Sequence, residues 1–159
     1  MGDGFGVKCG KCGYEFDAFL GIGMLALTEH EKYVKKMKAG KLGPEGKKFF
    51  EDYPKGVVNT EHAIAKCSSC GNYDDVYDLT MYIPYKNKEH LADKYGCIME
   101  SDIRGNYKKY MDYPHKCSAC GGSSRVHKEF EKEASEGVLK CPKCDGYMEK
   151  ILDSYILWD

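Results

Sequence analysis

Eight of the nine cysteines occur as four Cys-x-x-Cys pairs, and this repetition constrains the chain more than any other feature. Two thiolates at this spacing can hold one metal ion while backbone N–H groups of the turn point at the sulfurs. Glycine follows the second cysteine directly in three pairs, and after Asp145 in the fourth, and it supplies the positive φ that such a turn often needs. The sequence therefore predicts four metal-binding turns, here called knuckles: Cys9/Cys12, Cys67/Cys70, Cys117/Cys120 and Cys141/Cys144.

A structural tetrahedral site needs four ligands, so four knuckles predict two sites, and the knuckles can pair in three ways. Only 20 residues separate Cys120 from Cys141, which is within the usual range for a zinc ribbon. The spacing therefore favours one site at Cys117, Cys120, Cys141 and Cys144. The other site is then Cys9, Cys12, Cys67 and Cys70, whose two knuckles are 54 residues apart.

Two other kinds of cysteine chemistry fit the pattern less well. Disulfides form in oxidising compartments, and the sequence predicts a cytoplasmic protein, where thiols stay reduced. Thioredoxin-like chemistry uses a single Cys-x-x-Cys pair at the start of a helix, whereas here the pair is repeated. Cys97 belongs to no pair, and we expect it to behave as a small hydrophobic residue.

Two of the knuckles resemble those of the rubredoxins and of rubredoxin-like zinc ribbons. "KCGKCGYEFD" is similar to the first rubredoxin knuckle, and "CPKCDG" is similar to the second, with Asp145 inserted. In that family the two knuckles share one iron, whereas here they lie at opposite ends of the chain. All-thiolate tetrahedral sites suit zinc or a single iron. We expect two Zn²⁺ per chain, with iron as the alternative.

The segments between the knuckles predict both helices and strands. Helical spacing of apolar residues over 24–40, followed by Pro44 and ended by Pro54, predicts a helical insertion at about 24–54. The alternation from Tyr77 to Ile83 predicts a half-buried strand, and "EHAIAKC" predicts its partner strand leading into the second knuckle. Eight of the thirteen tyrosines lie in 73–113, where we expect them chiefly to cover small cores.

These elements predict a small α+β protein with two rubredoxin-like zinc ribbons made of short antiparallel strands. The first ribbon, with its helical insertion, would occupy 1–84, a connecting segment 85–112, and the second ribbon 113–159. Metal would replace the large hydrophobic core that so small a domain lacks.

Composition limits the function that we expect. The formal net charge is −1, and eight thiolates with two Zn²⁺ would make it about −5, so the charge disfavours nucleic acid. The longest apolar run, 18–27, is about half of the ~20 residues that span a bilayer. Neither a phosphate-binding loop nor a nucleophile elbow is present, and His62, His115 and His127 have no open metal site to complete.

We therefore expect a cytoplasmic binding or adaptor protein that contacts another protein, and composition and motifs favour a non-enzyme over an enzyme. Three alternatives stay open. The chain could bind single-stranded nucleic acid through tyrosines and lysines, act as a thiol redox sensor, or carry electrons if its metal is iron.

Overall fold

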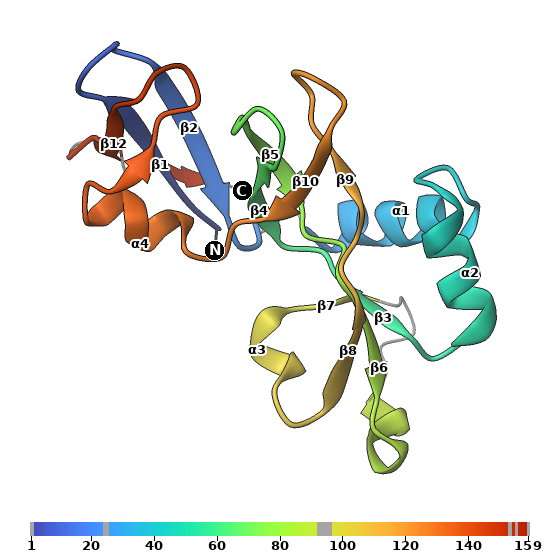
Figure 1. The fold of residues 1–159 in the computed structure, drawn as a ribbon. Helices are drawn as coiled ribbons and strands as arrows, with labels where there is room; N and C mark the ends of the chain where they lie inside the picture. The colour runs from blue at the N-terminus through green and yellow to red at the C-terminus, as the bar shows by residue number, and fades with distance from the viewer. Residues whose placement is uncertain (1, 24–25, 92–96, 153, 155, 159) are drawn as a thin grey trace. The chain divides into compact units, whose positions relative to one another are not determined.

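The computed structural model describes residues 2–23, 26–91, 97–152, 154 and 156–158. The chain divides into two compact units, of which unit 1 comprises 1–24, 62–76 and 114–159 and unit 2 comprises 25–61 and 77–113. Both units contain strands and helices, as predicted for an α+β protein (Figure 1). The division differs from the predicted one, because the chain leaves unit 1 twice and returns to it each time.

Unit 1 contains two antiparallel sheets. In the first, β1 pairs along one edge with β2, and its two ends pair with β12 and β13; β12 also pairs with β11. In the second, the strand order is β5-β4-β10-β9. The bounds are β1 Gly2–Cys9, β2 Glu15–Leu20, β4 His62–Cys67, β5 Tyr73–Tyr77, β9 His115–Lys116, β10 Ser123–Val126, β11 Leu139–Lys140, β12 Tyr147–Lys150 and β13 Ile156–Trp158, with helix α4 at Phe130–Ser135. The predicted strand leading into the second knuckle is confirmed by β4, whereas the strand that follows this knuckle is β5 and not the predicted one from Tyr77 to Ile83.

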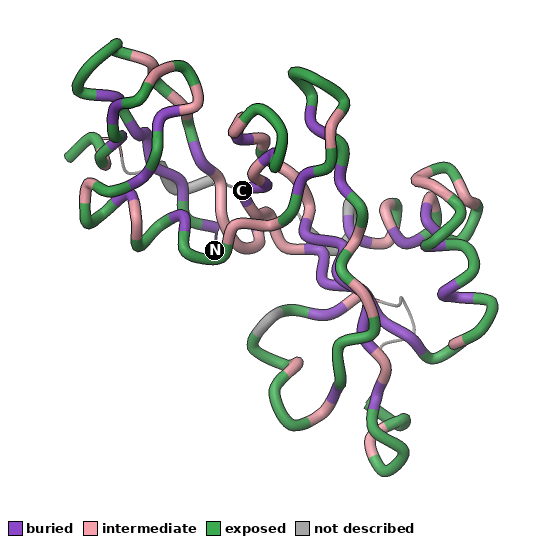
Figure 2. The backbone as a smooth tube through the Cα atoms, viewed as in Figure 1, coloured by how far each residue is buried: buried purple, intermediate pink, exposed green. Residues whose placement is uncertain are grey.

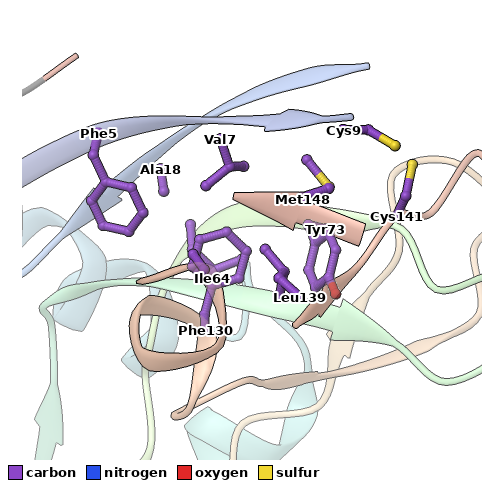
Figure 3. Close-up of a cluster of buried hydrophobic side chains, with 11 residues drawn as sticks. Phe5, Val7, Cys9, Ala18, Ile64, Tyr73, Phe130, Leu139, Cys141 and Met148 are labelled. Atoms are coloured by element: carbon purple, nitrogen blue, oxygen red, sulfur yellow. The ribbon is translucent and has the colours of Figure 1, made fainter. Parts of the chain in front are cut away.

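A single hydrophobic core joins the two sheets of unit 1. Phe130 of α4 is 1% exposed, and its ring centroid lies 6.1 Å from that of Phe5 and 5.2 Å from that of Tyr73. Figure 3 shows Ile64 and Tyr73 facing the side chains of β1 in this core, with Cys9 and Cys141 at one end. The two sheets of unit 1 thus share one core instead of having separate small cores.

Unit 2 contains the predicted helices. They are α1 (Ala26–Lys38) and α2 (Pro44–Asp52), and Pro44 occupies the first turn of α2. Val34, Met37 and Phe49 are buried between these helices and a four-stranded sheet of order β7-β3-β6-β8. The remaining elements are β3 Val57–Asn59, β6 Met81–Pro84, the 3-10 helix Lys86–Leu91, β7 Cys97–Ile98, α3 Glu100–Ile103 and β8 Tyr107–Met111. Figure 2 shows the buried residues of the sheet concentrated in β3 and β6.

The predicted continuous strand from Tyr77 to Ile83 is wrong. The chain breaks at Asp78–Thr80, where all three residues are buried and Leu79 has φ 55°. The amide of Leu79 donates to the Asn59 carbonyl (2.7 Å), and the Asp78 carboxylate accepts from the amide of Thr80 (3.0 Å). Local side-chain hydrogen bonds of this kind compete with strand pairing, and an alternation of apolar residues does not reveal them.

Cys97 lies in β7, half-buried against the apolar cluster under α1 and α2, which agrees with its expected hydrophobic role. No helix in the described part of the chain is both long and apolar enough to cross a membrane.

Candidate metal centres

The eight paired cysteines gather into two groups of four, both in unit 1. Within each group all four sulfurs lie within 4.8 Å of one another. Site 1 contains Cys9, Cys12, Cys141 and Cys144, and site 2 contains Cys67, Cys70, Cys117 and Cys120. The eight clustered residues are those that the sequence singles out, but the predicted pairing of the knuckles is wrong.

The strand pairing explains why the knuckles are nested rather than sequential. β1 pairs with β12 so that Cys9 is opposite Met148, which places the first knuckle beside the fourth. β4 pairs with β10 so that Cys67 is opposite Ser124, which places the second knuckle beside the third. Loop length alone is a weak guide here, because the long intervals are occupied by folded chain. The resemblance of the first and fourth knuckles to the two rubredoxin knuckles pointed to the observed pair.

All four knuckles share one backbone hydrogen bond, from the amide of the first cysteine to the carbonyl five residues later (2.8–3.0 Å). In the first three, the amide of a glycine also donates back to the first cysteine's carbonyl, and Gly13, Gly71 and Gly121 have φ of 74°, 73° and 69°. Asp145 replaces this glycine in the fourth knuckle, where the backbone does not take a positive φ. The glycine pattern in the sequence thus predicted the turn in three of four cases.

The sulfur positions fit a tetrahedral metal ion. Sulfur–sulfur distances are 3.6 Å (Cys9–Cys144) and 3.7 Å (Cys12–Cys141) in site 1, and 3.6 Å for both Cys67–Cys120 and Cys70–Cys117 in site 2. Four sulfurs at about 2.3 Å from a central zinc would be about 3.8 Å apart. A disulfide would bring two of them to about 2.05 Å. The residues present therefore fit a four-thiolate metal site.

Backbone amides direct hydrogen bonds at the sulfurs. Ser69 N donates to Cys67 Sγ (3.4 Å), Gly122 N to Cys120 Sγ (3.4 Å) and Gly146 N to Cys144 Sγ (3.3 Å). Such donors stabilise a thiolate over a thiol. These bonds come from the turn itself, so they would be present at both sites irrespective of side-chain identity.

The sulfurs cannot all ionise easily in the absence of a cation. The amide of Cys12 lowers the pKa of Cys9 to about 6, and the amide of Cys70 lowers that of Cys67 to about 6. At Cys120 the amide of Gly122 also acts to lower the pKa, yet the neighbouring sulfurs of Cys70 and Cys67, together with burial, raise it to about 12. One thiolate therefore disfavours the next, and a divalent cation would remove that conflict.

The two sites differ in the side chains around them. At site 1 the Lys11 ammonium donates to the Asp145 carboxylate, which links the first knuckle to the fourth. At site 2 the Asp74 carboxylate accepts from the amide (3.1 Å) and the hydroxyl of Ser118. Sequence reasoning missed Asp74, although its position just after the second knuckle was a signal.

The three histidines near the knuckles are not members of either cysteine group. His62 Nδ1 lies 2.9 Å from Asp75, and His127 Nε2 lies 2.9 Å from Glu133. His115 is buried at 7% exposure. Each group offers four sulfurs without a histidine.

Gly146 is required by close packing against sulfur, and we expect Gly146→Ala to weaken site 1. An added Cβ would lie 3.1 Å from Cys9 Sγ and 2.9 Å from Lys11 Cβ, so the two knuckles would have to separate. Overpacking of this kind costs about 1–3 kcal/mol of unfolding free energy. Denaturant unfolding and the rate of metal transfer to a colorimetric chelator measure the effect. Gly10→Ala is the matched control, because its Cβ meets nothing within 4 Å; equal effects of the two substitutions would contradict the packing argument.

No protein-family model, no curated protein and no solved structure matches this chain. The assignment of two candidate metal centres therefore depends on the cysteine geometry alone.

Proposed function

We propose that this chain is a metal-stabilised binding protein in which two structural Zn²⁺ sites hold unit 1 together. The main observation is that each site offers four sulfurs at tetrahedral spacing, with backbone amides donating to them. A site with four protein ligands has no open position for a substrate, which is typical of structural rather than catalytic zinc. The metal would neutralise the thiolates and cross-link knuckles that are far apart in the sequence.

Unit 2 is the better candidate for contacting a partner. Within its described residues it has no metal-binding group, and its own apolar clusters support it. It exposes Tyr85 (45%) and Tyr110 (43%), and Tyr110 is the extra residue of a bulge in β8 that places its ring against Phe49 and Tyr53. Tyrosine is enriched at protein interfaces, so we infer a protein partner for this surface.

The two units differ in net charge. Unit 2 has 14 basic and 12 acidic residues, whereas unit 1 has 10 basic and 13 acidic residues. Two zinc–cysteinate centres would add about four negative charges to unit 1. The net charge of unit 2 therefore favours single-stranded nucleic acid more than that of unit 1 does. Salt-dependent binding of oligonucleotides would support that alternative.

Metal analysis of protein purified without added metal tests the proposal, together with a visible spectrum. We expect two zincs per chain and no colour. Less than one metal per chain would overturn the proposal and favour reversible thiol oxidation at the exposed residues Cys70 and Cys120.

An electron carrier is a second candidate for site 1, because its knuckles are those that resemble the rubredoxin pair and they lie together. A red protein with one iron per chain, lost on substitution of Cys9 but not of Cys67, would support this reading.

A further inference from the structure

Unit 1 contains an open pocket of about 450 Å³, lined by strands β4 and β10 and the second knuckle. Its volume is within the usual range for small-molecule sites. The lining residues include Lys66, Ser68 and Gly71 from β4 and the knuckle, and Arg125 and His127 from β10 and its end. The pocket belongs to unit 1, whereas Tyr85 and Tyr110 belong to unit 2.

Two cations lie side by side in this pocket. The register of β4 and β10 places Arg125 directly opposite Lys66, so their side chains are on the same face of the sheet. Two like charges directly opposite each other destabilise a strand pair. An arrangement that costs stability in the free protein is explained if an anion occupies the space between the two side chains.

No acidic side chain within the described residues forms an ion pair with either cation. Lys66 Nζ lies over the Tyr73 ring, 5.5 Å from its centroid. Glu133 is already held by His127, at 2.9 Å from Nε2. By contrast, several lysines of unit 1 are paired with carboxylates, including Lys8 with Glu15 and Lys150 with Glu131. Lys66 and Arg125 therefore keep their charge available in a unit that is acidic as a whole.

Cys67 of the neighbouring cysteine site also lines this pocket. Successive residues of a strand point to opposite faces, so Lys66 and its cross-strand partner Arg125 lie on the face opposite to the Cys67 side chain. The amide of Ser69, rather than either cation, donates a hydrogen bond to Cys67 Sγ (3.4 Å).

We propose that this pocket binds a phosphate group, with the Arg125 guanidinium as a two-pronged donor and the Lys66 ammonium as the second positive charge. The planar guanidinium fork matches two oxygens of a phosphate, and lysine adds a compact charge. The proposal goes beyond the metal-binding role, and it assigns a function to one of only two arginines in the chain.

The test is a titration of the metal-loaded full chain with pyrophosphate, followed by backbone amide shifts in an NMR spectrum. We expect saturable shifts in 65–67 and 124–127. Arg125→Gln and Lys66→Gln should each weaken binding about tenfold, as expected for loss of a hydrogen bond to a charged group. Arg125→Lys keeps the positive charge but loses the guanidinium fork. Its affinity for pyrophosphate should lie between that of the two glutamine variants and that of the natural chain.

Arg104→Gln is the matched control, since it makes the same change in charge at the exposed end of α3 in unit 2. It should leave pyrophosphate binding unchanged. Shifts that do not saturate, or an equal loss on Arg104→Gln, would overturn the proposal, as would full affinity in Arg125→Gln with its metal retained. A short oligodeoxythymidine identifies the source of the phosphate: tighter, strongly salt-dependent binding through Arg125 assigns a nucleic-acid strand, and binding of pyrophosphate alone assigns a small molecule.

Discussion

The double variant Cys9→Ser/Cys141→Ser is expected to retain one metal per chain, and Cys9→Ser/Cys67→Ser to retain none. The first pair removes two sulfurs from site 1 and none from site 2, because Cys9 and Cys141 belong to the same group of four. The second pair removes one thiolate from each group. Each damaged group keeps three sulfurs at most, which is too few to close a structural tetrahedral site.

Metal content by plasma emission, after dialysis against a weak chelator, measures the difference. Cys97→Ser is the control for loss of a thiol, because Cys97 lies in unit 2 and outside both groups, and it should keep both metals. The opposite result, no metal in the Cys9/Cys141 variant and one in the Cys9/Cys67 variant, would restore the sequential pairing and contradict the nested one.

The sequence predicted the ligands far better than their grouping. A Cys-x-x-Cys turn is local, since its sulfurs, amides and glycine lie within six residues, and all of that information is in one short stretch. The grouping depends on which strands pair, and β1 with β12 spans almost the whole chain. The interval of 20 residues between Cys120 and Cys141 instead contains β10 and α4, which pack Phe130 into the shared core.

In unit 2, too, the sequence predicted the element set by local signals, the helical insertion, and mispredicted a strand that depends on long-range contacts. The helical insertion was predictable because apolar spacing, Pro44 and the final glycine are local signals, and Gly40 ends α1 with φ 71°. The strand at Tyr77–Ile83 was mispredicted because its alternation is real but its hydrogen bonds are not those of a strand. Asn59, which lies nineteen residues before Asp78, forms the hydrogen bonds to Asp78, Leu79 and Thr80 that interrupt the strand. A single sequence does not show that contact.

A shared core also changes what the metals are needed for. Ile64 and Tyr73 from the second sheet pack with Phe5 and Val7 from the first, and the Tyr73 hydroxyl donates to the Lys140 carbonyl (3.0 Å). Cys9 and Cys141 belong to this core as well as to site 1 (Figure 3). Loss of one metal should therefore disturb the packing of both sheets, so we expect the two sites of unit 1 to be coupled in stability.

Withdrawal of both metals is expected to unfold unit 1 and to leave unit 2 largely folded. Structural zinc contributes about 10–16 kcal/mol of apparent folding free energy in small domains, which is comparable to the whole stability of an ordinary domain. Unit 1 would lose that contribution twice and would gain the repulsion between neighbouring thiolates. Unit 2 has no cysteine group within its described residues, and its core of Val34, Met37 and Phe49 does not depend on metal.

Amide spectra of the labelled chain before and after a strong chelator measure this outcome residue by residue. Dispersed signals should disappear for 2–20, 62–76 and 115–150 and persist for 30–59, and re-addition of Zn²⁺ should restore them. Cys97→Ser protein gives the matched control, because it should respond to chelation and to zinc as the natural chain does. A metal-free chain that keeps the dispersed signals of unit 1 would show that the shared core suffices for folding and that the cysteine sites serve another purpose. Simultaneous loss of the signals of both units would show instead that the folding of unit 2 depends on unit 1. Unit 2 consists of two chain segments, 25–61 and 77–113, which are joined through 62–76 of unit 1.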